Sequence, residues 1–167
     1  ICSEEEILEQ QIVTGIAYSK DEAQISVRGV ADRPGIAAAV FEPLAAGHIV
    51  VDMIVQNVSE DGKSTDITFT VPSSDYDRAL AVLGQLKGEI GYRALQGAKD
   101  VAKVSAIGIG MRSHSGVAAK AFKALADRGI NLRAITTSEI KFSVLIDEEF
   151  TELAVRTLHH LYGLDAA

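Results

Sequence analysis

The sequence predicts an α+β fold made of two ferredoxin-like βαββαβ units, with the first unit inserted within the second. Three observations support this prediction: an apolar composition, an internal repeat, and one strand-like segment that neither copy of the repeat contains. The 167 residues are 47% hydrophobic and only 5% aromatic, so the core is expected to consist of Ile, Val, Leu and Ala. A chain of this length holds one ordinary domain or two small ones.

The internal repeat begins with two strand-like segments, 23–30 and 102–109, which lie 79 positions apart. Both are rich in β-branched residues, which favour strands. Each leads into a turn, at 31–35 in the first copy and at 110–116 in the second. Such matching segments at a fixed spacing indicate two copies of one structural unit.

Each turn leads into a segment with the apolar spacing of a helix. Gly47 and Gly129 are placed to end these two helices, and Pro43 is expected to kink or shorten the last turn of the first. Matching apolar residues lie 81 positions apart, namely Ala37, Phe41, Leu44, Ala45 and Ile49 in the first copy and Ala118, Phe122, Leu125, Ala126 and Ile130 in the second.

Two strands and a second helix follow in each copy. A hairpin turn at Asp61-Gly62 joins the strands of the first copy, and Ser74 to Asp77 resembles a capping box before its second helix. The first copy closes with a strand near 92–98. The other elements are expected at 49–58, 66–71 and 76–86 in the first copy and at 131–136, 141–146 and 150–161 in the second.

The second copy lacks a closing strand, which would leave one edge of its sheet open. The segment 11–18 has strand character and belongs to no other element, so we expect it to complete the second copy. The predicted domains are therefore 23–101 for the first copy and 11–22 with 102–167 for the second. Residues 1–10 form an acidic leader.

Charge and cysteine content exclude several classes of function. The net charge of −7 disfavours nucleic acid and anionic membranes as partners, since both attract basic surfaces. One cysteine rules out an internal disulfide framework and fits a reducing, cytoplasmic location. No apolar run approaches the ~18 residues of a membrane span.

The turn 32–35 is the first candidate site. It leads directly into a helix N-terminus, where free N–H groups and the helix dipole favour an anion such as a carboxylate. Asp32 could pair with an ammonium group, and the two together would bind an amino acid. The alternative is that Asp32 caps the helix and Gly35 only forms the turn.

Other motifs give weaker signals. Gly108 and Gly110 resemble part of a dinucleotide loop, but the third glycine comes six residues later. His114 has neighbouring serines but no third group to orient the imidazole, so a catalytic triad is not supported. His159 and His160 point in different directions on a helix, which makes a shared metal improbable. We expect no catalytic residue, metal or cofactor.

The sequence resembles the C-terminal regulatory region of aspartate kinase over nearly its whole length. The motifs that carry the resemblance are Ile12-Val-Thr-Gly-Ile-Ala17, Ala31-Asp-Arg-Pro-Gly35, Val51-Asp-Met-Ile-Val-Gln-Asn57, Thr65-Asp-Ile-Thr-Phe-Thr70, Gly108-Ile-Gly-Met-Arg-Ser-His-Ser-Gly-Val117 and Ile135-Thr-Thr-Ser-Glu-Ile140. The resemblance implies a tandem pair of ACT domains, one inserted in the other. The kinase domain of that family is missing here, so the chain is expected to be non-catalytic by itself, either a separate β subunit or a fragment.

The resemblance also implies two effector sites. A threonine-type site would use Asp32 for the ammonium, the backbone at Gly35 and Ala37 for the carboxylate, and Gln56 for the polar side chain. Asn131 and Leu132 would be contributed across a dimer. A lysine-type site would use the second copy, at His114, Gly116, Val117, Ala118, Ser138 and Glu139, with Asp52 available for the ε-ammonium. Ala118 stands where some lysine-sensitive relatives carry threonine, so this site lacks one hydroxyl.

The function expected from these residues is feedback sensing. A homodimer would bind threonine, lysine or both, and would regulate the kinase domain or catalytic α subunit of aspartate kinase. The alternative is an ACT pair that regulates a different biosynthetic enzyme. A catalytic ferredoxin-like protein is a third class, but no cluster of titratable residues supports it.

Overall fold

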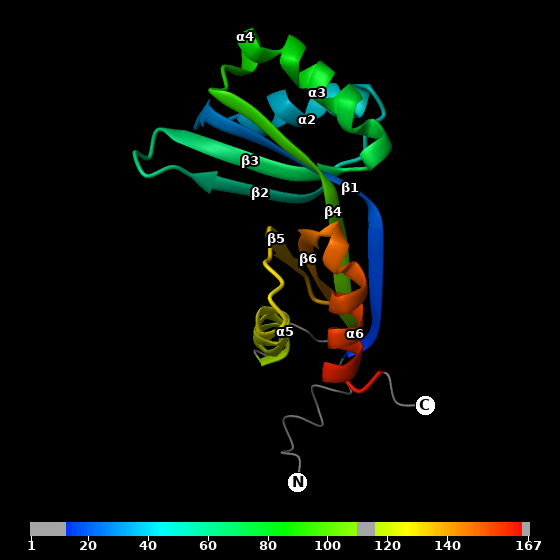
Figure 1. The fold of residues 1–167 in the computed structure, drawn as a ribbon. Helices are drawn as coiled ribbons and strands as arrows, with labels where there is room; N and C mark the ends of the chain where they lie inside the picture. The colour runs from blue at the N-terminus through cyan, green and yellow to red at the C-terminus, as the bar shows by residue number, and fades with distance from the viewer. Residues whose placement is uncertain (1–12, 110–115, 165–167) are drawn as a thin grey trace. The chain divides into compact units, whose positions relative to one another are not determined.

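The computed structural model describes residues 13–109 and 116–164 (Figure 1). Contacts divide the chain into two compact units: an inner unit, residues 21–100, and an outer unit, formed by the segments 1–20 and 101–167 on either side of it. The domain bounds predicted above stay a prediction, because close contact alone does not show that a unit folds independently.

The inner unit has the strand order β2-β3-β1-β4, and the helices α2 and α3 cover one face of these strands (Figure 1). The pairings of β3 with β1 and with β2 are antiparallel. The elements are β1 (Val13–Ala31), which enters the unit at Asp21, α2 (Ile36–Ala46), β2 (Asp52–Val58), β3 (Ser64–Val71), the 3₁₀ turn η1 (Ser73–Asp75), α3 (Tyr76–Gln85), the short α4 (Lys87–Ile90) and β4 (Ala94–Gly108), which leaves the unit after Asp100.

The outer unit has the strand order β1-β4-β6-β5, using the first part of β1 and the last part of β4. Its other elements are α5 (Gly116–Asp127), β5 (Ala134–Thr137), β6 (Lys141–Asp147), the 3₁₀ turn η3 (Glu148–Phe150) and α6 (Thr151–Leu161). Both units thus contain the order β-α-β-β-α, and the predicted α+β class with its inserted arrangement is confirmed.

Two pairs of expected strands are joined in the structure. Residues 13–18 of the first expected strand and the expected strand 23–30 belong to the single strand β1, and residues 94–98 and 102–108 of the two later expected strands belong to β4. Residues 11 and 12 lie outside the described residues. The residues between each pair, 19–22 and 99–101, contain neither Gly nor Pro, so nothing in the sequence breaks the extended chain there. Each strand therefore contributes to both units.

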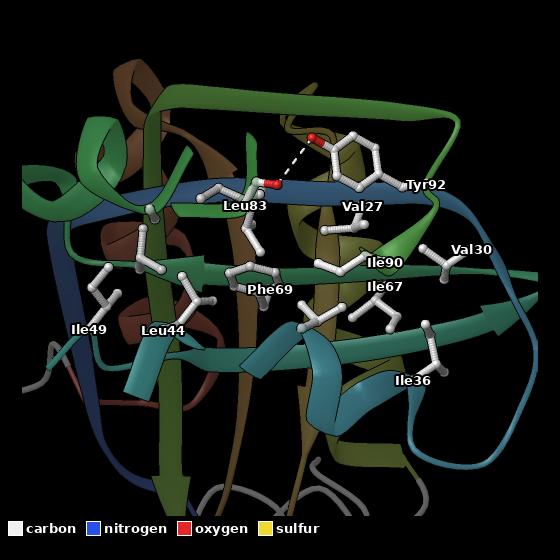
Figure 2. Packing of buried hydrophobic residues seen from close by; sticks show 14 of the residues in the cluster. Val27, Val30, Ile36, Leu44, Ile49, Ile67, Phe69, Leu83, Ile90 and Tyr92 are labelled. Carbon is white, nitrogen blue, oxygen red and sulfur yellow. Dashed lines mark hydrogen bonds between the residues drawn. The ribbon is translucent and has the colours of Figure 1, made fainter. Parts of the chain in front are cut away.

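The inner core packs the helices onto one face of the strands. Phe41 of α2 and Phe69 of β3 meet edge to face, with ring centroids 5.1 Å apart, which is a favoured geometry for aromatic pairs. The buried Tyr92 donates its hydroxyl to the carbonyl of Leu83 at 3.2 Å (Figure 2). The buried positions of α2, namely Ile36, Val40 and Leu44, have the helical spacing expected from the sequence.

The outer core has the same architecture. Phe122 of α5 and Phe142 of β6 form an edge-to-face pair with centroids 5.9 Å apart. Tyr162, which follows α6, donates its hydroxyl to the carbonyl of Val117 at 2.7 Å, inside the core. The helices α5 and α6 bury Val117, Ala121 and Leu125, and Ala154 and Leu158, against the strands.

Two local expectations about helix ends differ from the structure. The capping box from Ser74 to Asp77 does not form, because a 3₁₀ turn precedes α3 and no side chain caps its N-terminus. Asp75 instead pairs with Arg78 at 2.8 Å. Pro43 lies inside α2 without ending it, and the helix continues to Ala46.

Candidate functional site

The turn between β1 and α2 is held by the backbone. The N–H of Asp32 donates to the carbonyl of Lys63 at 3.1 Å, and the N–H of Ile36 donates to the carbonyl of Arg33 at 3.2 Å. Gly35, the residue before α2, has φ of +89°, a left-handed conformation that favours glycine. The sequence Asp-Arg-Pro-Gly thus brings the chain directly into the start of a helix.

The N-terminus of α2 has no side-chain cap. Asp32 is exposed, and its carboxylate has no partner among the described residues. The N–H groups of Gly35 and Ala37 likewise have no partner within that part of the chain. The structure therefore does not support Asp32 as the helix cap. A carboxylate and free N–H groups therefore lie within the six residues 32–37, a combination that suits a ligand with an ammonium group and a carboxylate.

Gln56 belongs to the helix-covered face of the inner unit. It lies opposite Ile67 in the β2–β3 ladder, and residues directly opposite one another in antiparallel strands share a face. Ile67 is buried in the same cluster as Ile36, the first residue of α2. The side-chain amide of Gln56 is exposed and has no partner among the described residues. Gln56 is therefore available to a ligand on the side of the sheet where α2 begins.

A β-bulge turns Asp52 to the other face. The register shifts between Asp52, which pairs with Thr70, and Val55, which pairs with Thr68, so β2 carries one extra residue there. Met53 within this bulge is buried and has φ of +47°, an uncommon conformation for a side-chain-bearing residue. Asp52 accepts a hydrogen bond from the N–H of Met53 at 2.8 Å.

Sequence reasoning missed two residues of this region. The bulge at Met53 depends on which residues pair across the strands, and no motif in the sequence marks it. Thr70, opposite Asp52, has a buried hydroxyl with no partner among the described residues. A buried hydroxyl without a partner is uncommon in folded proteins, so this position is unusual.

The second repeat arranges its candidate residues differently. Gly116 and Ala118 are half-buried in the first turn of α5, whereas Val117 is buried in the core and its carbonyl accepts the hydrogen bond of Tyr162. A ligand can therefore reach the first turn of α5 but not the side chain of Val117. His114 lies outside the described residues.

Ser138 and Glu139 are exposed in the hairpin turn between β5 and β6. The N–H of Ser138 donates to the carbonyl of Lys141 at 2.7 Å, and its hydroxyl accepts from the N–H of Lys141 at 3.3 Å. Ser138 therefore has a structural role in closing the turn. Asn131 is exposed and Leu132 is half-buried, both in the link between α5 and β5.

The inner unit contains the candidate residues Asp32, Gly35, Ala37 and Gln56, and the outer unit contains Gly116, Val117, Ala118, Ser138 and Glu139. Asp52 belongs to the inner unit, and Asn131 and Leu132 to the outer one.

Features of metal or membrane proteins are not found within residues 13–109 and 116–164. That part of the chain contains no group of three or more His, Cys, Asp or Glu placed to hold a metal ion. None of its helices is both long and apolar enough to cross a membrane. The described carboxylate with a clearly altered pKa is Asp61, whose pKa is lowered mainly by a hydrogen bond from Ser59 in an exposed turn.

Comparison with known proteins identifies the class of the two repeats. A sequence model of the ACT domain matches residues 25–85 and 104–162, which together make up most of the chain. The chain therefore belongs to the ACT domain family. Within that family it is a regulatory region of the aspartate kinase type, as its relatives indicate.

The chain is 52% identical to an aspartokinase of Pseudomonas aeruginosa over 166 residues, which cover 99% of this chain and 40% of that protein. A crystal structure of aspartokinase alpha and beta subunits is 51% identical, with a TM-score of 0.84, and the match covers 90% of this chain and 99% of that one. The regulatory subunit of aspartate kinase from Thermus thermophilus, in its ligand-free form, is 42% identical with a TM-score of 0.84, covering 90% of this chain and 98% of that subunit. The chain spans about 40% of the length of the curated relatives it matches.

Proposed function

We propose that this chain senses end-product amino acids and transmits feedback inhibition to an aspartate kinase catalytic domain or α subunit. The observation that carries the proposal is the start of α2, where the exposed carboxylate of Asp32 lies close in sequence to an uncapped helix N-terminus. Membership of the ACT family supports a regulatory role, and the aspartate kinase relatives support the choice of enzyme.

Threonine is the proposed ligand of the inner unit. Its carboxylate would accept hydrogen bonds from the free N–H groups of Gly35 and Ala37. Its ammonium group would pair with Asp32, and its hydroxyl would bond the amide of Gln56. The left-handed Gly35 supports this assignment, since a side chain there would strain the turn.

Lysine is the proposed ligand of a second site in the outer unit. The half-buried first turn of α5, at Gly116 and Ala118, and the exposed pair Ser138 and Glu139 would supply polar contacts. His114 and the backbone of Val117 belong to this proposal through the family resemblance. Asp52 belongs to the inner unit, so its role toward the ε-ammonium stays a prediction from the family resemblance.

The proposed signal is a population shift. A ligand that binds the inhibited arrangement better than the active one changes their ratio by its differential affinity. We propose a homodimer in which Asn131 and Leu132 of one copy complete the threonine site of the other. A cytoplasmic location follows from the proposed partner, a biosynthetic kinase.

Calorimetric titration of the chain with threonine, with lysine and with both tests the proposal. Asp32→Ala should reduce threonine affinity by about 1.5–3 kcal/mol, the typical contribution of a hydrogen bond to a charged group. Because Asp32 does not cap α2, the same variant should keep the melting temperature of the ligand-free protein. Asp32→Asn serves as the matched control, since it keeps the shape and removes the charge.

Three results would contradict the proposal. The first is that neither amino acid binds at millimolar concentration. The second is that Asp32→Ala lowers the melting temperature and leaves threonine affinity intact. The third is that the chain binds threonine but leaves an aspartate kinase catalytic subunit unaffected, which would favour a sensor for a different enzyme.

A further inference from the structure

A hollow of about 520 Å³ lies where α5 and α6 pack together in the outer unit. This volume is within the range of small-molecule sites. Four of its lining side chains carry or can carry positive charge, namely Arg128, Arg156, His159 and His160. None of its lining residues is acidic, although the chain has 23 Asp and Glu against 16 Lys and Arg.

Local structure explains how these groups converge. Arg156 precedes His159 by three residues and His160 by four on α6, so each histidine is a neighbour of Arg156 on the helix surface. Arg128 follows the last residue of α5, at the end of the helix that packs against α6. Favourable interaction with a helix C-terminus would account for the two histidines and for Arg128, but not for Arg156 in the middle of α6.

The two arginines are not neutralised within the described residues. Neither Arg128 nor Arg156 forms a side-chain hydrogen bond or an ion pair there. The adjacent acid, Asp127, is already paired with Lys123 at 3.2 Å. Glu152, one turn before Arg156 on α6, lines a second hollow together with Arg156, but the two form no ion pair among the described residues.

We propose that this hollow binds a compact phosphorylated metabolite. Arginine presents a planar fork of N–H donors that matches phosphate oxygens, and two forks with two imidazoles suit a group with more than one negative charge. The net charge of −7 argues against an extended polyanion such as RNA or an anionic membrane, because the rest of the surface would repel it. The absence of an acidic residue from the lining argues against an amino acid, whose ammonium group would have no partner.

Two lining residues of the hollow are non-polar. Ala124 and Leu161 give the hollow an apolar wall beside the cationic groups. Ligand sites commonly combine an apolar lining with a few polar groups that fix orientation. The site therefore fits a phosphate attached to an organic group better than a free inorganic ion.

Calorimetry with pyrophosphate and with ATP, each added to the chain without metal, tests the proposal. Both should bind the unaltered chain at roughly millimolar or lower concentration, and ATP should bind more tightly because of its organic part. The double variant Arg128→Gln/Arg156→Gln should lose affinity at least about tenfold. Lys141→Gln is the matched control, since Lys141 is exposed on β6 of the outer unit, does not line the hollow and forms no ion pair among the described residues. The affinity of this variant should stay within about twofold of the unaltered chain.

Further measurements separate the site from general charge effects and from misfolding. Arg128→Lys/Arg156→Lys keeps the charge and loses the forks, so it should bind more weakly than the unaltered chain. The melting temperature and circular dichroism of each ligand-free variant verify its fold. The double glutamine variant should bind threonine with the affinity of the unaltered chain. Loss of phosphate binding can therefore be told apart from loss of the proposed amino-acid sensing.

The proposal is overturned if neither probe binds, or if the double glutamine variant and Lys141→Gln lose equal affinity. It is also overturned if vesicles of phosphatidylglycerol bind and the soluble probes do not, because the ligand would then be a membrane surface.

Discussion

The two repeats share their architecture down to the polar contacts between strands, but they differ in the contacts at their helix ends. Each has a pair of hydroxyls in matching strand positions: Ser26 and Thr68 are 2.9 Å apart in the inner unit, and Ser105 and Ser143 are 2.7 Å apart in the outer unit. Both pairs lie directly opposite one another in antiparallel ladders. The strand pairing is therefore conserved between the repeats down to single polar contacts.

The tyrosines of the two cores have no such correspondence. Tyr92 follows the short helix α4 and bonds the carbonyl of Leu83 in α3. Tyr162 follows α6 and bonds the carbonyl of Val117 in the first turn of α5. In these two repeats, the polar contact between the strands is the same, whereas the hydrogen bonds at the helix ends differ. We therefore expect the two repeats to differ in ligand specificity at the turns that lead into α2 and α5, because these turns lie at helix ends.

The largest effect is expected from truncating the aromatic pairs. Phe69→Ala and Phe142→Ala each remove a ring that is at most 2% exposed, so each should lower the free energy of unfolding by ~3–5 kcal/mol. Denaturant unfolding measures both values. Phe69→Leu and Phe142→Leu should cost less than about 1.5 kcal/mol each. A large loss for one alanine variant and a small loss for the other would show that the two cores are not equivalent.

The assignment of ligands to repeats can be tested next. Gln56→Ala should weaken threonine binding by ~1–3 kcal/mol, because the ligand hydroxyl would lose its partner. Ser138→Phe should block lysine by adding bulk at the second site, and Ser138→Ala controls for the loss of its hydrogen bond to Lys141. Any effect of Ser138→Phe on threonine must arise through coupling between sites, typically ~1–3 kcal/mol and equal in both directions. Titrations in which Ser138→Phe abolishes threonine binding and Gln56→Ala changes nothing would reverse the assignment.

A smaller effect is expected at the paired hydroxyls. Ser105→Ala should destabilise the chain by ~1–3 kcal/mol, since it leaves the buried hydroxyl of Ser143 without its partner. The double variant Ser105→Ala/Ser143→Ala should be closer to the unaltered protein than the sum of the single variants. Thermal unfolding of all three, with Ser26→Ala as the equivalent change in the inner unit, tests this. Strict additivity would show that the two hydroxyls do not interact.

The smallest effect concerns the hairpin turn of the inner unit. The hydroxyl of Ser59 donates to Asp61 at 2.5 Å and is the main cause that holds the pKa of Asp61 below its usual 3.8. Ser59→Ala should therefore raise the pKa of Asp61, as an NMR titration would measure. A carboxyl whose pKa is lowered by folding stabilises the protein above its unfolded pKa, and this contribution is lost as the pH falls through the folded pKa. An unchanged pKa in the variant would assign the shift to the backbone N–H of Lys63 instead.

Sequence periodicity was enough to predict the order of the longer helices and of the strands, but not the short helix α4. Matching apolar residues such as Phe41 and Phe122 mark the helix faces that pack onto the strands, and both rings do so. The continuity of β1 and β4 was not predicted, because two separate repeats were assigned separate strands and no turn residue marked either junction. The uncapped start of α2 was left open, since aspartate near a helix start is common whether or not it caps.

The features that were not predicted depend on pairing between distant segments. The bulge at Met53 exists because β2 has one more residue than β3 between two fixed contacts, which a local pattern does not reveal. The same holds for the hollow between α5 and α6: a shared metal at His159 and His160 was judged improbable from the sequence, and Arg128 approaches these histidines only through helix packing.

The continuity of β1 and β4 has a consequence for how the chain can be cut. Each time the chain passes from one unit to the other, at residues 20–21 and 100–101, it does so within an extended strand. Proteases prefer exposed loop tips with small polar residues, and neither crossing has that character. Two cleavages would be needed to release the inner unit, and a single cleavage at either crossing would leave the halves joined through the other strand. We therefore expect proteases to degrade the two repeats together rather than to release one of them intact.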